Sequence, residues 1–412
     1  MADLGWIDAA LVSARPQAVA ALLRYFRDLD LAEEAYQDAC LRALKAWPKN
    51  GPPRDPAAWL IMVGRNAAID VTRRRAKQTP LPDEDQISDD GDEEAVVVDR
   101  IDAADYRDDV LRLLFICCPP DLPATQQVAL ALRIVSGLSV KQIAKAFLVS
   151  EAAMEQRITR AKSKVAGAGV PFETPGAIER AERLAAVAAM IYLVFNEGYT
   201  SSEPGSDRAQ LCYEAIRLTR LLLRMYPAEP EIMGLLALML LQHARSAARF
   251  DSTGNTVLLD DQNRDLWKQP QIQEGLALID KAMRARQPGP YQIQAAIAGL
   301  HSRAKTAADT DWVEIDGLYA ALERHTPSPV VTLNRSVATS KVGGPQAGLD
   351  LIAPLGDRLD TYFYFHGVRG SFLMQLGRDS EAREAFNRAI ALANTPAEAA
   401  HIRQHLDNLA KK

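Results

Sequence analysis

The sequence is poor in the residue types on which most enzymes and metal sites depend. Only six of its 412 residues are histidine, four are cysteine, and aromatic residues make up 6%. It contains no C-x-x-C pair, no P-loop, no G-x-G-x-x-G and no G-x-S-x-G motif. His401 and His405 have a spacing that can bind zinc, but no third ligand lies near them in the sequence. We therefore predict no catalytic centre, no cofactor and no metal site, and a protein that is not an enzyme.

Nothing in the sequence indicates export or membrane insertion. Residues 1–6 lack the basic and apolar segments of a signal peptide, and no uncharged apolar run reaches ~18 residues. Cysteines are few and do not suggest a disulfide framework, so we expect reduced, small core residues. These features favour a cytoplasmic protein. The four thiols are those of Cys40, Cys117, Cys118 and Cys212.

Charge is distributed unevenly along the chain, although the formal net charge is only −5. Residues 76–109 contain thirteen acidic and three basic residues, a local balance of −10. Residues 126–165, in contrast, contain seven lysines and arginines against two glutamates. This segregation is typical of an anion-binding module beside an acidic tether. We expect residues 78–103 to form a flexible acidic linker, because residues 79–94 have little apolar content and the acidic run at 89–94 repels itself.

The hydrophobic pattern predicts an all-α protein of several domains, and no stretch alternates long enough for a sheet. Residues 9–75 have helical periodicity, interrupted by a proline-rich loop at 48–56. Residues 104–165 are helical again, and a proline- and glycine-containing boundary at 167–176 precedes a last helical part. The expected divisions are 1–77, 78–103, 104–167 and 171–412. In the first of them, the residues expected to pack at helical spacing are Ala18, Leu22, Leu23, Phe26, Ala35, Ala39, Leu41 and Leu44.

The last part of the chain contains a degenerate repeat. Residues 346–352 and 381–389 carry matching alanines 35 residues apart, and 274–282 precedes the first stretch by 72 residues. A period near ~34 residues with two helices per unit is the tetratricopeptide (TPR) spacing. Small residues would let the paired helices approach, with one phenylalanine between them. The best unit comprises Gly370, Gly377, Ala382, Phe386 and Ala389.

Residues 139–164 have the pattern of a helix-turn-helix. Ser139 and Gln142 form a capping box that starts one helix, and Ser150 can cap the next after a turn at 148–150. Met154, Ile158 and Ala161 would pack the second helix inward, which leaves its polar side for a DNA groove. The alternative is an ordinary amphipathic hairpin with a solvated basic face.

The polar side of that second helix carries chemistry suited to duplex DNA. An arginine can bind guanine through two hydrogen bonds, and a glutamine can bind adenine. Arg160, Lys162 and Lys164 suit phosphates, which fix register but not sequence. Glu155 also lies there, and an acid facing DNA is repelled unless it accepts from a cytosine amino group. The candidate DNA-binding residues are Ser150, Glu151, Ala153, Gln156, Arg157, Arg160, Lys162 and Lys164.

Two segments resemble bacterial RNA polymerase sigma factors of the extracytoplasmic-function (ECF) type. Residues 17–77 resemble region 2 of this family and residues 106–165 resemble region 4, in the family's order. In region 2 the matching positions are Asp30, Ala32, Glu34, Ala35, Gln37, Asp38, Leu41, Arg42, Ala43, Trp59, Leu60, Arg65, Asn66, Asp70 and Arg73 to Arg75. In region 4 they are Leu122, Pro123, Gly137 to Ser139, Ile143, Ala144, Arg157, Arg160 and Ala161.

The resemblance implies roles for these positions. The helix-turn-helix would bind the −35 element, and the loop 47–56 would capture a flipped base of the −10 element. Positive charge on the helix after that loop suits single-stranded DNA. The implied −10 residues are Asn50, Arg54, Arg65, Asn66, Arg73, Arg74 and Arg75. The implied contacts with the β′ clamp helices of polymerase are Asp30, Glu33, Glu34, Gln37, Asp38 and Arg42, which would otherwise be a solvated helix face.

The part after about residue 171 resembles the TPR-containing C-terminal extension of one ECF group, notably at 195–199 and 258–267. The resemblance implies a sigma factor that binds core polymerase, through its β′ clamp helices and β flap, and promoter DNA. The fused domain would modulate activity and take a further protein or peptide partner. A second hypothesis is a DNA-binding regulator with a TPR sensor that does not join polymerase. A third is an adaptor that binds peptides through its TPR surface.

Overall fold

The computed structural model describes residues 5–77, 103–119, 121–147, 149–167, 177–199, 207–251, 254, 256–393 and 396–410. Within these ranges the chain is helical, and the one β-contact is an isolated antiparallel bridge between Phe250 and Thr256. The predicted all-α fold is confirmed. The chain divides into two compact units, residues 1–194 and 195–412. No described helix is both long and apolar enough to cross a membrane.

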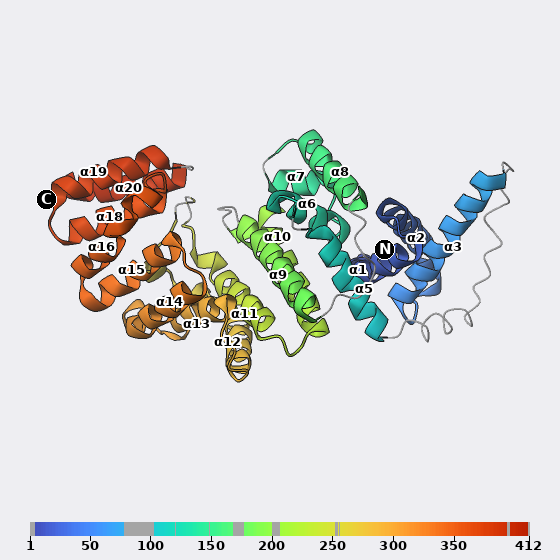
Figure 1. Cartoon of the computed structure of the whole chain (residues 1–412), viewed down its shortest axis with the longest axis horizontal. Helices are drawn as coiled ribbons and strands as arrows, with labels where there is room; N and C mark the ends of the chain where they lie inside the picture. Colours follow the sequence, from blue (N-terminus) through green and yellow to red (C-terminus); the bar gives the residue numbers. More distant parts are fainter. Residues whose placement is uncertain are drawn as a thin grey trace. The chain divides into compact units, whose positions relative to one another are not determined.

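The first unit begins with three helices that all contact one another: α1 (Gly5–Phe26), α2 (Leu29–Asn50) and α3 (Pro56–Lys77) (Figure 1). Asp28 starts α2, because its side chain accepts a hydrogen bond of 3.0 Å from the backbone of Leu31. Gly64 lets α3 approach α2 closely. A Cβ at this position would lie 2.8 Å from the carbonyl oxygen of Ala35.

Helix α2 buries a different stripe from the one expected. Its buried apolar positions include Ala35, Tyr36, Ala39, Ala43 and Trp47, at spacings of three and four residues. The side chains of Leu41 and Leu44 lie on another face and are 60% and 52% exposed. The prediction that these two leucines pack inward was wrong. The tyrosine and tryptophan bring larger apolar surfaces, and they determine which face of α2 is buried.

The proline-rich loop is shorter than predicted. Helix α2 continues through Pro48 to Asn50, which leaves only residues 51–55 outside the helices. A proline this close to a helix end removes one donor from the last turn and costs less than one in the interior. Trp47 fixes this end, since its ring lies 6.0 Å from that of Trp6 and 5.4 Å from that of Trp59. Gly51, at φ 82°, ends the helix by donating to the carbonyl of Trp47.

The rest of the first unit contains the predicted helix-turn-helix. This part of the unit comprises α5 (Ala103–Cys117), α6 (Ala124–Ile134), α7 (Val140–Ala146) and α8 (Glu151–Gly167). The last two of these helices form the helix-turn-helix. Helix α9 (Ala177–Tyr199) begins in the first unit and ends in the second. The acidic linker predicted before Ala103 and the boundary predicted between α8 and α9 lie outside the described residues.

The second unit is a succession of helix pairs (Figure 1). The second helices of three pairs carry the repeated stretches of the sequence analysis. The pairs are α11 (Pro230–Ala244) with α12 (Gln269–Met283), α13 (Pro290–Arg303) with α14 (Trp312–His325), α15 (Pro329–Gly343) with α16 (Pro345–Ile352), and α18 (Phe363–Gln375) with α19 (Asp379–Leu392). The remaining helices are α10 (Asp207–Met225), α17 (Gly356–Leu359) and α20 (Pro396–Ala410).

The α18–α19 pair has the packing predicted for the best repeat unit. Phe386 is fully buried, and a Cβ at position 370 would lie only 2.6 Å from its ring. Ala382 and Ala389 are also fully buried, and Gly377, at φ 72°, occupies the turn between the helices. The identification of these pairs as TPR units remains a prediction.

Replacing Gly370 with alanine should destabilise the second unit. The new methyl group would displace the ring of Phe386, and overpacking of this kind costs about 1–3 kcal/mol. The matched control is Gly317→Ala in α14, where a Cβ meets nothing within 4 Å. That change should stabilise by up to about 1 kcal/mol, because alanine is the better helix former. Urea unfolding of both variants checks this. Equal stabilities would contradict the packing described for α18 and α19.

Candidate functional site

The helix-turn-helix forms through the local interactions that the sequence predicts. The side chain of Ser139 accepts from the backbone of Gln142, whose own side chain accepts from Ser139. Ser150 caps α8 by accepting a hydrogen bond of 3.2 Å from the backbone of Ala153. The predicted inward positions of α8, Met154, Ile158 and Ala161, are all buried. The capping box, the second cap and the packed face are thus confirmed.

The opposite side of α8 offers an exposed polar surface. Arg157 and Ala153 are half-buried beside it. Lys164 is exposed and its amine donates to the backbone carbonyl of Asp121. The other exposed polar side chains of α8 are those of Glu151, Glu155, Gln156, Thr159, Arg160 and Ser163.

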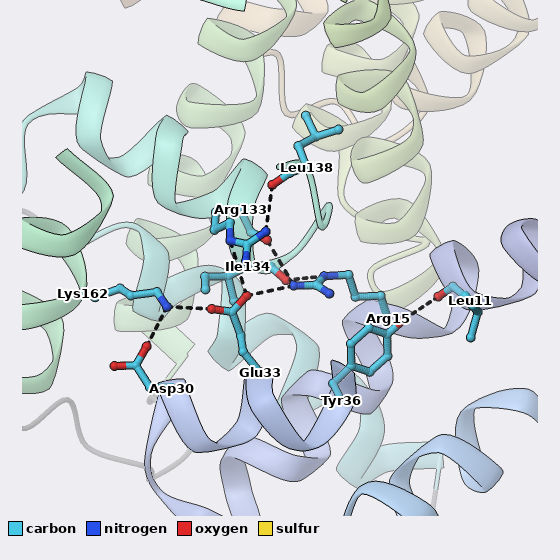
Figure 2. A network of polar contacts seen from close by, with 9 residues as sticks. All are labelled: Leu11, Arg15, Asp30, Glu33, Tyr36, Arg133, Ile134, Leu138 and Lys162. Carbon is cyan, nitrogen blue, oxygen red and sulfur yellow. Dashed lines mark hydrogen bonds and ion pairs between the residues drawn. The ribbon is translucent and has the colours of Figure 1, made fainter. Parts of the chain in front are cut away.

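Lys162, another predicted DNA contact, is instead bound to α2 of the same chain (Figure 2). Its amine lies 2.6 Å from a carboxylate oxygen of Asp30 and 2.7 Å from one of Glu33. Burial opposes the charge on Lys162, but its hydrogen bonds and ion pairs with the two acids outweigh burial and raise its pKa. One predicted DNA residue and two predicted polymerase residues therefore bind one another.

Glu33 lies at the centre of this network, with a side chain only 5% exposed. Its second oxygen accepts a hydrogen bond of 3.0 Å from Arg15 of α1 and lies 3.8 Å from Arg133 of α6. Together with Lys162 of α8, three cations from three helices surround one carboxylate (Figure 2). A buried carboxylate needs such partners, because an isolated charge is very unfavourable away from water.

The backbone around α6 is shaped to receive Arg15. Its guanidinium donates to the carbonyls of Ile134, at 3.0 Å, and Arg133, at 3.2 Å. Gly137, at φ 75°, lies against the arginine, and a Cβ there would approach its Cδ to 2.7 Å. On its other side Arg15 lies 4.9 Å from the ring centroid of Tyr36. The family-like glycine at 137 therefore has a structural role, which is to admit this arginine.

A second buried acid joins α1 to α5. Asp109, 5% exposed at its side chain, pairs with Arg24 of α1 and with Arg112 of its own helix, both at 3.2 Å. In the sequence, Asp109 is the last residue of the acidic stretch 76–109. The helices that resemble region 2 and those that resemble region 4 thus share two buried acid clusters within one unit.

The predicted polymerase residues do not share one surface. Glu34 and Gln37 are exposed, Asp30 is 77% exposed at its side chain, and Asp38 and Arg42 are half-buried. Glu33 is buried, so in this conformation it is neither exposed for the polymerase contact predicted for it nor part of a solvated helix face. Leu41 and Leu44 share the exposed side of α2 with Glu34 and Gln37, since these positions recur every three or four residues. Sequence reasoning had assigned both leucines to the core; their spacing from Glu34 and Gln37 was the signal that could have revealed them.

Only some of the predicted −10 residues are exposed to solvent. Asn50, Arg54 and Asn66 are exposed, and Arg65 is half-buried, 5.7 Å from the ring centroid of Tyr25. Trp59 is half-buried and packs edge-on against Trp47. The side chains of Asp70 and of Arg73, Arg74 and Arg75 lie outside the described residues.

The thiols and histidines have structural surroundings. All four cysteines are free, and burial raises the pKa of Cys118 and of Cys212 to about 12, so both remain protonated. The ring of His405 stacks on that of Phe386. The ring of His401 lies edge-on to that of His405, with 5.0 Å between the ring centroids. Over the residues that the structure describes, no group of three or more potential ligands could hold a metal ion.

Comparison with known proteins identifies three families along the chain. Residues 11–78 match sigma-70 region 2, and residues 113–165 match sigma-70 region 4. Residues 183–283 match a family of unknown function, DUF6596. The chain is also 69% identical to an uncharacterized protein of Rhizobium meliloti (strain 1021) over 411 residues, which are 100% of this chain and 97% of the relative. The first two matches coincide with the helices that meet at Glu33.

Replacing Glu33 with alanine should strongly destabilise the first unit. The change leaves Arg15 and its partners without their carboxylate, and breaking a buried ion pair costs about 3–5 kcal/mol. Glu34→Ala is the matched control, because the neighbouring glutamate is exposed and should change stability by less than about 0.5 kcal/mol. Thermal and urea unfolding measure both. A Glu33 variant as stable as the control would contradict the network.

Proposed function

Because the chain belongs to the sigma-70 family of transcription factors, we propose that it is an ECF-type sigma factor that directs core RNA polymerase to promoters. The observation that carries the proposal is the pairing of region 2 with a capped region 4 helix-turn-helix whose polar face is exposed. The protein would act in the cytoplasm, where polymerase and promoters are. It would open DNA with binding energy and without catalysing a reaction.

Polymerase would dock on the exposed side of α2. This side combines exposed leucines at 41 and 44 with the polar residues Glu34 and Gln37. A mixed surface of this kind suits a protein interface, because apolar side chains supply burial and the polar rim supplies orientation. Asp30, Asp38 and Arg42 would extend the contact. Region 4 would reach the β flap.

Promoter DNA would be bound at two places. Helix α8 would enter the major groove of the −35 element, with Gln156 and Arg157 at base edges and Arg160 and Lys164 at phosphates. The segment after Trp47, with Asn50 and Arg54 exposed, would hold the separated −10 strand together with α3. Each mismatched base pair would cost about 1–3 kcal/mol.

The network at Glu33 would have to open for every predicted contact to form. Lys162 cannot bind a phosphate while its amine is held by Asp30 and Glu33. In the same way, Glu33 cannot face polymerase while Arg15 and Arg133 surround it. We expect holoenzyme assembly to separate α8 from α2, with polymerase contacts replacing the internal ones.

The second unit would modulate this activity, through a TPR-like surface that takes a protein or peptide partner. The succession of helix pairs that begins at Pro230 supports this proposal. A chain ending after Tyr199 tests the idea in a reporter assay. Unchanged transcription would exclude a modulating role.

Leu41→Glu should weaken binding to core polymerase by about tenfold or more, since the charge replaces apolar surface at the proposed interface. Val342→Glu, at a 51% exposed valine of α15, is the matched control and should bind normally. Titration of labelled chain with purified core polymerase gives both affinities. If the full chain binds DNA but no core polymerase, the alternative of a regulator that does not join polymerase is correct.

Arg157→Ala should reduce transcription in a promoter-dependent manner, because an arginine at a base edge contributes about 1–3 kcal/mol of discrimination. Lys164→Ala should weaken all sequences alike and lower the salt dependence of binding. Promoters selected from a random library by the holoenzyme provide the templates for run-off transcription. Equal loss on all templates for both variants would refute the base-reading role of Arg157.

A further inference from the structure

The connection between α11 and α12 interrupts the helix pairs of the second unit. Its described residues form three short 3₁₀ turns, η1 (Ser246–Ala248), η2 (Leu259–Asp261) and η3 (Arg264–Leu266), besides the isolated bridge described above. This connection gathers arginines and aromatic rings around the start of the unit. The residues concerned are Tyr199, Arg245, Arg249, Arg264, Trp267 and His301.

The three arginines are half-buried and bind uncharged groups. Arg245 donates to the hydroxyl of Tyr199 at 3.2 Å, and Arg249 donates to the backbone carbonyl of the same tyrosine. Arg264 donates to the carbonyls of His301, at 2.6 Å, and Ala304, at 2.9 Å. Its guanidinium also lies 4.5 Å from the ring centroid of Trp267, and that of Arg245 lies 6.0 Å from it.

No carboxylate of the described chain lies within ion-pair distance of these three guanidinium groups. Arg335 shows the usual arrangement in the same unit, because it pairs with Asp316 at 3.1 Å and with Glu323 at 2.8 Å. Its pKa is raised accordingly. The cluster around Arg245 differs, because its positive charges are compensated only in part, by Asp260 and Asp309, which act on Arg264 without forming an ion pair with it.

The charges of the cluster act on one another. Burial, and to a smaller extent the neighbouring Arg245, lower the pKa of Arg249 although Tyr199 opposes them. Burial also lowers the pKa of Arg264, where Asp260 opposes the shift and Arg245 adds to it. Burial, Arg245 and Arg264 together lower the pKa of His301 to about 4, so this imidazole is neutral at neutral pH. Charges gathered at this density are unfavourable unless an anion joins them.

Several nitrogen atoms of the same cluster are buried without a hydrogen-bond partner. They are Nη2 of Arg264, Nε1 of Trp267 and Nδ1 of His301. Trp267 is only 3% exposed, so its indole N–H is a costly donor to leave unpaired. Two oxygen atoms nearby in the chain, of Gln262 and Thr310, are also unpartnered. A group that accepts several hydrogen bonds and carries negative charge would satisfy both the donors and the arginines.

We propose that this cluster binds the oxyanion group, carboxylate or phosphate, of a small molecule. Arg245 and Arg264 hold the charge, Trp267 donates its indole N–H, and the ring of Tyr199 borders the site. Arginine suits this role because its fork of donors matches both kinds of oxyanion. The inference goes beyond promoter recognition and is independent of it, because the cluster lies wholly in the second unit.

The test uses the full chain with inorganic phosphate, acetate and benzoate as probes, each at constant ionic strength with chloride as the reference. At saturation, at least one oxyanion should raise the Tm by about 3 °C or more over chloride. Arg245→Gln and Arg264→Gln should each weaken that anion by about tenfold or more. Arg217→Gln, at an arginine that pairs with Glu214, is the matched control and should respond as the unaltered chain does.

A second measurement does not depend on the folding of any arginine variant. The chain has five tryptophans, and the indole N–H signal that disappears in Trp267→Phe identifies that residue by NMR. Phosphate or a carboxylate should move this signal in the unaltered chain, whereas chloride should not. A response to phosphate alone indicates a phosphate ester, and a response to carboxylates alone indicates a carboxylic acid. No response to any oxyanion, or equal responses in all variants, would overturn the proposal.

Discussion

The carboxylate of Glu33 is the interaction on which the arrangement of the first unit depends. It holds α1, α2, α6 and α8 together, because Arg15, Arg133 and Lys162 reach it from three directions. Each of these groups would be unfavourable in the interior alone, and together they compensate one another. The family-like region 2 and region 4 therefore meet through buried charge, in addition to apolar packing.

This arrangement relates the two predicted binding functions to each other. The surfaces that would meet polymerase and duplex DNA are partly bound to one another through Asp30 and Lys162. The exposed side of α2 around Leu41 stays accessible. Under the proposed function, the chain in this conformation would offer a first contact to polymerase, and the full DNA surface would become available only after rearrangement.

Features that depend on neighbours in the sequence were predictable, and features that depend on distant partners were not. The capping box at Ser139 and the packing of Phe386 follow from local spacing and are confirmed. The burial of Glu33 depends on Arg15 and on Lys162, which lies 129 residues away in the sequence. A local sequence pattern cannot predict such a pairing.

Helix α2 shows a second kind of failure, in which the local pattern was ambiguous. Its apolar residues lie on two faces, and only the spacing of Leu41 from the polar residues Glu34 and Gln37 indicated which face is exposed. Trp47 packs between Trp6 and Trp59, and this contact fixes which face of α2 is buried. The same contact holds the last turn of α2, which extends past Pro48 to Asn50. The arginine cluster beside Trp267 could not be predicted either, because its members come from segments far apart in the sequence, from Tyr199 to His301.

Salt affects the buried ion pairs of Glu33 and the exposed cations of α8 to different extents. Mobile ions screen exposed cations such as Arg160 and Lys164 strongly, and salt weakens their attraction to phosphates steeply. Counterions have little access to a carboxylate that is 5% exposed, so its internal pairs persist. If α8 binds DNA as proposed, a rise in salt would therefore weaken that binding more than it weakens the internal pairs of Glu33.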